Sequence, residues 1–126
     1  MIASFRDVVL DATEPAVVGA FWGAVLGREV EIDADGDVTL RPGADGGPSV
    51  TVLRVPEVKT VKNRLHLDVT LAPGHELTDL LSLGATVLVE PHEHSWWVLA
   101  DPEGNEFCAF PPDSDASNDA DAEASS

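Results

Sequence analysis

The sequence predicts an α+β fold in which one βαβββ unit occurs twice within a single domain. Three landmarks recur: a short apolar strand, a helix that ends at Leu-Gly, and a final apolar strand. They lie at 6–10, 26–27 and 48–53 in the first half, and at 65–69, 83–84 and 106–110 in the second. We therefore expect repeats of about 2–56 and 64–111, each with the order strand, helix and three strands.

The first repeat has clear start and stop signals. Residues 4–10 form its predicted first strand, with Asp7 on one face. Thr13 is the predicted N-cap of a helix that Pro15 opens and Gly27 ends, and apolar residues recur between them at helical spacing. Predicted strands follow at 29–33, 38–41 and 49–55.

The second repeat follows a linker over residues 56–63. Its predicted elements are a strand at 64–71, a helix at 75–83 entered through Pro73, and strands at 86–89, 96–100 and 106–110. The last two strands are joined by Asp101-Pro102-Glu103-Gly104-Asn105, in which proline and glycine favour a tight turn.

Composition limits the classes of partner. The chain has 126 residues, 44% of them apolar, enough for one domain with a core. Residues 65–126 contain thirteen acidic residues and no Lys or Arg, so nucleic acid is a poor candidate partner. No apolar run reaches membrane-spanning length and no signal peptide is visible, which predicts no membrane partner. A single cysteine excludes an internal disulfide and fits the reducing cytoplasm.

The last residues differ from the rest. From Asp113 onward the chain contains only Asp, Ser, Ala, Asn and Glu, none of which builds a core. We expect residues 112–126 to form a disordered acidic tail.

The repeat, the string Asn-Arg-Leu-His-Leu-Asp at 63–68 and the string Asp-Pro-Glu-Gly-Asn-Glu-Phe-Cys at 101–108 together resemble the vicinal oxygen chelate superfamily. The similarity covers residues 2–111 and is greatest to its glyoxalase-like domain proteins. Other members are glyoxalase I, extradiol dioxygenases, and fosfomycin and bleomycin resistance proteins. The resemblance implies that the two βαβββ repeats form curved mixed sheets around a cleft, with each helix on the convex side of its sheet, and that the chain is a homodimer. It implies no particular reaction, because this fold hosts many activities.

In the metal-using members, the first and last strands of each unit supply the ligands. The resemblance places those positions at Asp7, Thr51, His66 and Cys108, where members usually carry His, Gln or Glu, with Glu in place of Cys108. A hydroxyl and a soft thiol suit a hard divalent ion poorly. We therefore expect no metal cofactor; a divalent metal, if bound, would take Asp7, His66 and Cys108, a set that zinc accepts.

The expected cleft has a defined lining. Strand parity and the repeat predict a ligand-binding surface made by Asp7, Thr51, His66, Asp68, Cys108 and at least one of Trp96 and Trp97. Within it, His66 is the candidate catalytic acid or base, with Asp68 on the same strand face; the alternative is a structural histidine.

Two other motifs contain residues that could carry chemistry. The nearby Glu103 and Glu106 oppose a catalytic thiolate at Cys108, which we interpret as a buried apolar residue. His92 and His94 have a spacing that could bind metal, but the segment reads as a solvated loop.

Three functions remain open. The favoured one is a metal-independent protein that binds a neutral or cationic, partly aromatic small molecule in its cleft. The second is a lyase, isomerase or dioxygenase that uses His66, with or without a divalent metal. The third is a regulatory module that kept the fold and lost the chemistry.

Overall fold

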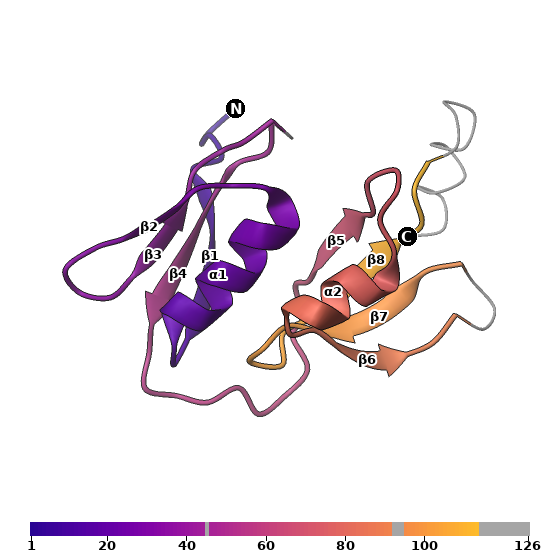
Figure 1. Cartoon of the computed structure of the whole chain (residues 1–126). Helices are drawn as coiled ribbons and strands as arrows, with labels where there is room; N and C mark the ends of the chain where they lie inside the picture. The colour runs from indigo at the N-terminus through magenta and orange to yellow at the C-terminus, as the bar shows by residue number, and fades with distance from the viewer. Residues whose placement is uncertain (45, 92–94, 114–126) are drawn as a thin grey trace. The chain divides into compact units, whose positions relative to one another are not determined.

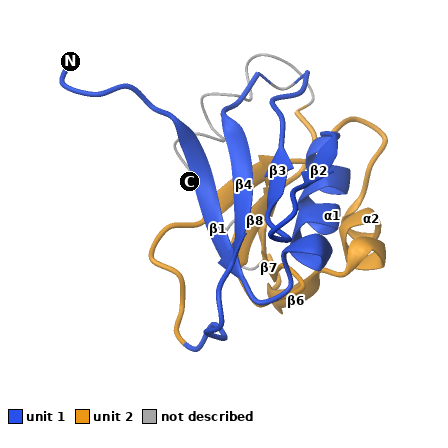
Figure 2. Ribbon diagram, turned by 90° about the vertical axis from the view of Figure 1, so that its left-hand side faces the viewer, with its two compact units in different colours: residues 1–60 blue, residues 61–126 orange. Residues whose placement is uncertain are grey.

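The computed structural model describes residues 1–44, 46–91 and 95–113. The chain divides between Thr60 and Val61 into two compact units, coloured separately in Figure 2. His92, His94 and the predicted tail beyond Asp113 lie outside the described residues, so the predictions made for them stay predictions.

The first unit is one mixed sheet with one helix (Figure 1). Its elements in chain order are β1 (Asp7–Ala12), α1 (Pro15–Leu26), β2 (Val30–Ile32), β3 (Val38–Leu40) and β4 (Ser49–Arg54). The strand order is β1-β4-β3-β2; β1 runs parallel to β4, and the other neighbours are antiparallel.

The second unit has the same topology. Its elements are β5 (Leu67–Thr70), α2 (Leu77–Leu83), β6 (Thr86–Val89), β7 (Trp97–Ala100) and β8 (Glu106–Phe110). The order is β5-β8-β7-β6, with β5 parallel to β8 and the other pairs antiparallel. The predicted α+β fold with two βαβββ repeats is therefore confirmed.

Helix α1 lies close against the sheet of the first unit. A Cβ added at Gly19 would lie 2.6 Å from Cγ1 of Val38, and one added at Gly23 would lie 2.6 Å from Cγ2 of Val30. Val38 and Leu40 are fully buried. The helix thus covers the face of the sheet that carries these side chains. Because strand side chains alternate, Asp7 and Thr51 belong to the opposite face.

The ends of α1 match the sequence signals only in part. Gly27 ends the helix in the left-handed conformation with φ of 64°, as predicted. The N-cap is Glu14 and not Thr13, and Glu14 makes no capping hydrogen bond through its side chain. Pro15 explains the difference, because it takes the first helical position and restricts the residue before it to non-helical conformations.

Three predicted elements have ends displaced by two residues or more, because of partners distant in sequence or local capping. Strand β1 begins and ends later than predicted because it pairs with β4 from Asp7↔Ser49 to Ala12↔Arg54. Strand β5 is shorter than predicted because its pairs with β8 run from Leu67 to Thr70. Helix α2 begins two residues late, because the N–H of Glu76 donates to the Asp79 carboxylate at 3.0 Å and caps the first turn.

In the described part of the chain, neither helix combines the length and apolarity that crossing a membrane requires.

Candidate functional site

The turn between β7 and β8 is organised by the carboxylate of Asp101, whose residue is only 3% exposed. Its Oδ1 accepts the backbone N–H of Glu103 at 2.9 Å and that of Asn105 at 3.0 Å. The side-chain amide of Asn105 donates to Oδ2 at 2.9 Å. The most distinctive string of the sequence therefore has a structural role: Asp101 satisfies the turn's N–H groups.

Asn63 links that turn to the chain entering β5. Its side-chain amide donates to Oδ1 of Asn105 at 2.9 Å, and its backbone N–H donates to Oε1 of Glu106 at 3.0 Å. The two strings that carried the family resemblance thus form one hydrogen-bonded network. Sequence reasoning missed this contact, because it depends on the parallel pairing of β5 with β8.

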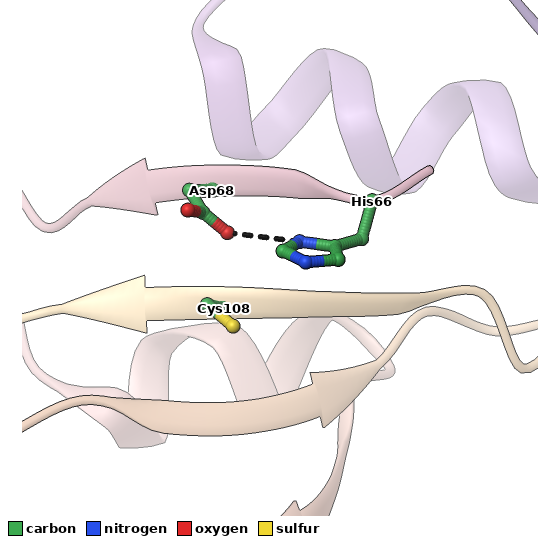
Figure 3. A group of neighbouring side chains, drawn as sticks. All are labelled: His66, Asp68 and Cys108. Atoms are coloured by element: carbon green, nitrogen blue, oxygen red, sulfur yellow. Dashed lines mark hydrogen bonds and ion pairs between the residues drawn. The ribbon is translucent and has the colours of Figure 1, made fainter. Parts of the chain in front are cut away.

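Three candidate residues meet on the β5–β8 pair (Figure 3). Asp68 lies opposite Cys108 in the strand register, and Oδ1 of Asp68 is 3.0 Å from Nδ1 of His66. One polar atom from each of His66, Asp68 and Cys108 lies within 4.8 Å of the others. The side chains of His66 and Asp68 are 45% and 35% exposed, so the group remains open to a ligand.

The two neighbouring tryptophans lie on opposite faces of the same sheet. Trp97 pairs with Ala109, whereas Val98 pairs with Cys108, so Trp97 does not share the face of Cys108. The ring of Trp96 lies 5.2 Å from that of Phe110, centroid to centroid. Phe110 is two residues beyond Cys108 and therefore on its face. Trp96 is therefore the tryptophan on the sheet face of His66, Asp68 and Cys108.

Asp7 and Thr51 form a separate pair in the first unit. The hydroxyl of Thr51 donates to Oδ2 of Asp7 at 3.1 Å, on the face of the sheet away from α1. That this pair and the His66 group line one cleft stays a prediction.

Cys108 has a strongly raised thiol pKa, about 11. The largest cause is burial, followed by the negative charge of Asp68 and a hydrogen bond with it. The sequence suggested Glu103 and Glu106 as the opposing acids, and the structure assigns that effect to Asp68 instead. At neutral pH the thiol is protonated, so it is neither a thiolate nucleophile nor a source of charge.

We expect alkylation of Cys108 by iodoacetamide to be tens of times slower at pH 8 than that of a free thiol, because so little thiolate is present. The rate should rise about tenfold per pH unit between pH 7 and 10, since the raised pKa of Cys108, about 11, lies above that window. Asp68→Asn should accelerate the reaction at pH 8 by lowering that pKa, whereas Glu103→Gln should not. Mass spectrometry follows this single thiol, and equal rates for wild type and Asp68→Asn would contradict the assignment.

A second group of acidic residues lies at the turn between β2 and β3. Asp33, Asp35 and Asp37 lie close together, but Oδ1 of Asp33 accepts the backbone N–H groups of Asp35 and Asp37 at 2.9 and 3.0 Å. Oδ1 of Asp37 accepts the N–H of Arg54 at 2.8 Å. These carboxylates stabilise the turn between β2 and β3.

The fold agrees with comparison to known proteins. Residues 7–110 match the glyoxalase-like domain family, and the chain belongs to this family. It has the fold of the vicinal oxygen chelate superfamily, as its two mixed four-stranded sheets indicate. No curated protein gives a significant match.

Solved structures with little sequence identity share the fold. The fosfomycin resistance protein FosX of Listeria monocytogenes, solved with Mn(II) and sulfate, has a TM-score of 0.67 and 13% identity over 90% of this chain and 94% of its own. A glyoxalase/bleomycin resistance protein/dioxygenase family enzyme of Burkholderia phytofirmans PsJN has a TM-score of 0.65 and 19% identity, over 86% and 98%. Hypothetical protein SA1046 of S. aureus has a TM-score of 0.65 and 17% identity, over 88% and 95%. These similarities establish architecture only.

The residues that the resemblance assigns to the superfamily's metal positions are a poor fit for a hard divalent ion. In the first unit the Thr51 hydroxyl donates a hydrogen bond to the carboxylate of Asp7. In the second, Cys108 supplies a neutral thiol where a carboxylate is usual. Only Asp7 and His66 remain as ordinary ligands for such an ion.

Proposed function

We propose that this chain is a small-molecule-binding protein that works without a bound metal. Its ligand is neutral or cationic and carries an aromatic part. The observation that carries the proposal is one sheet face on which Trp96 packs beside Phe110 and Asp68 holds His66. An aromatic surface next to a carboxylate suits a flat or positively charged molecule. Residues 65–126 contain no Lys or Arg, and the charge of Lys62, which reaches Cys108, is opposed there by the stronger effect of Asp68.

Arg6, Arg41 and Arg64 could reverse this charge preference if one of them entered the site, and the structure gives a partner for Arg41. Arg41 is already paired: its Nε lies 2.9 Å from Oε1 of Glu31. The hydrogen bond and charge of Glu31 raise the pKa of Arg41. This guanidinium is therefore engaged on its own sheet, which supports the preference for neutral or cationic ligands.

The proposal is tested by a ligand screen followed by replacement of one tryptophan at a time. We expect a panel of aromatic amines and neutral aromatics to raise the melting temperature, whereas aromatic carboxylates and phosphates should not. Trp96→Ala should weaken binding of a hit about tenfold, because one aromatic contact contributes about 0.5–1.5 kcal/mol beyond its buried area. Trp97→Ala is the matched control and should leave the affinity within about twofold.

Anionic hits alone, or a loss of binding in Trp97→Ala but not in Trp96→Ala, would refute this description of the ligand and its surface. Melting curves of both variants identify a loss of binding that comes from unfolding.

An enzymatic function is the second candidate. The observation that favours it is the contact between Asp68 and Nδ1 of His66, because a carboxylate that orients an imidazole is a common arrangement for a general base. Such an enzyme would be a lyase, isomerase or dioxygenase of the family's type.

Metal analysis separates the two candidates. We expect purified protein to contain far less than one equivalent of Zn, Fe, Mn, Ni or Mg, because Thr51 and Cys108 replace the usual ligands. Inductively coupled plasma mass spectrometry of the wild type, with His66→Ala as the control, measures this. A stoichiometric metal that His66→Ala abolishes would support the metal-dependent enzyme instead.

We also propose that the chain forms a homodimer. Strand β2 is a sheet edge with exposed apolar side chains, Val30 at 41% and Ile32 at 59%. Such an edge is commonly covered by another chain, and twofold dimers are the commonest soluble assembly. Light scattering at micromolar concentration tests this, and a monomer would refute it.

A further inference from the structure

The orientation of the His66 ring has a consequence for the ligand, which rests on the proposed function. The carboxylate of Asp68 only accepts hydrogen bonds when ionised, so the 3.0 Å contact with Nδ1 requires the ring to carry its proton there. In the neutral ring the other nitrogen, Nε2, is then an acceptor. The His66 side chain is 45% exposed and is therefore open to contact.

The backbone on both sides of His66 is anchored. Three residues before His66, Asn63 is bound to Asn105 and Glu106. Directly after His66, Leu67 begins the pairing of β5 with β8, opposite Phe107. The anchored backbone fixes the position of the residue, and the contact with Asp68 orients its ring, so the acceptor is preorganised.

We propose that His66 Nε2, fixed by Asp68, is a hydrogen-bond acceptor that selects ligands carrying an N–H or O–H donor beside an aromatic ring. In this arrangement Trp96 and Phe110, on the same sheet face, contact the aromatic ring of the ligand, and the ligand's donor group points to Nε2 of His66. Asp68 is a positioning residue here, because it acts through the imidazole. The binding protein therefore recognises aromatic amines, amidines or phenols in preference to aromatic molecules without a donor.

The tautomer of His66 is measurable without any ligand. Long-range proton–nitrogen correlation spectra of protein labelled with ¹⁵N-histidine distinguish a protonated ring nitrogen from a bare one. At about pH 8.5, two units above the ordinary imidazole pKa, we expect Nδ1 to be protonated and Nε2 bare. His66→Gln identifies the signals of this ring.

Asp68→Asn should remove the preference for this tautomer, because a neutral amide can either donate to Nδ1 or accept from it. The chain contains a matched control. His75 Nδ1 lies 3.0 Å from Oδ2 of Asp79, the same kind of contact on an unrelated surface. Asp79→Asn should change the signals of His75 and leave those of His66 unchanged. A wild-type His66 with its proton on Nε2 would overturn the proposal.

Two cations separate hydrogen bonding from charge. Benzamidinium and trimethylphenylammonium both carry a positive charge beside a benzene ring, but only benzamidinium has N–H donors. We expect the wild type to bind benzamidinium about tenfold more tightly, the effect of one hydrogen bond to a preorganised acceptor. Asp68→Asn should abolish that preference while both ions still contact Trp96.

Equal affinity of the wild type for both ions would overturn the acceptor role and leave the proposed function standing. Failure of both ions and of the neutral aromatics would refute the proposed function, and the tautomer measurement would still decide the state of His66.

Discussion

Replacement of Asp101 by alanine is expected to lower the free energy of unfolding by about 3 kcal/mol, the largest effect of any single polar substitution described here. The carboxylate is buried and accepts the N–H groups of Glu103 and Asn105 and the Asn105 side-chain amide. Alanine would leave these donors without their partner inside the turn. The midpoint of thermal unfolding should fall by roughly 10 °C.

Asp101→Asn should have an intermediate effect on stability. It keeps one oxygen for the backbone N–H groups but presents an amide to the Asn105 side chain, so about half of the loss should remain. Asp113→Ala changes an exposed acid near the end of the described chain and should shift stability by no more than about 0.5 kcal/mol. Urea denaturation measures all three, and equal stabilities for Asp101→Ala and Asp113→Ala would contradict the structural role of the turn.

Gly19→Ala should also destabilise the protein, by about 2 kcal/mol, although alanine is the better helix former. Helix propensity alone would stabilise the variant by about 0.5–1 kcal/mol. The added methyl group would lie 2.6 Å from Cγ1 of Val38, which is fully buried and branched at Cβ. Because that side chain has no free space to move into, the steric cost exceeds the gain in propensity.

A double-mutant cycle identifies the cause. Val38→Ala alone costs stability through a cavity, but combined with Gly19→Ala it makes room for the new methyl group. The double variant should therefore lose at least 1 kcal/mol less than the two single losses together. If the losses simply add, or if Gly19→Ala is stabilising, the close packing of α1 on β3 is not the reason for glycine here.

The sequence was sufficient for the architecture because its signals are local and occur twice. Gly27 and Gly84 end both helices, and β6 and β8 have the predicted bounds. Strand ends were harder to predict, because β1 takes its length from β4, which lies far along the chain. No local pattern specifies where such a partner begins.

The candidate site shows the same division. The alternation of strand side chains correctly predicted that Asp68 accompanies His66, and that Trp96 and Trp97 face opposite ways. It could not predict which acid raises the pKa of Cys108, because Asp68 reaches that thiol from a neighbouring strand. Nor could it reveal the hydrogen bond between Asn63 and Asn105, which depends on two loops that meet where β5 and β8 begin.

The parallel pairing of the first and last strands in each unit also has a consequence for the order of folding. Strands β6 and β7 are neighbours in sequence and can pair early, whereas β5 must wait for β8, beyond a helix and two strands. The same holds for β1 and β4. Closing such long loops costs conformational entropy before any contact compensates for it. Strand β1, which carries Asp7, and strand β5, which follows His66, are therefore the last strands that can readily join their sheets.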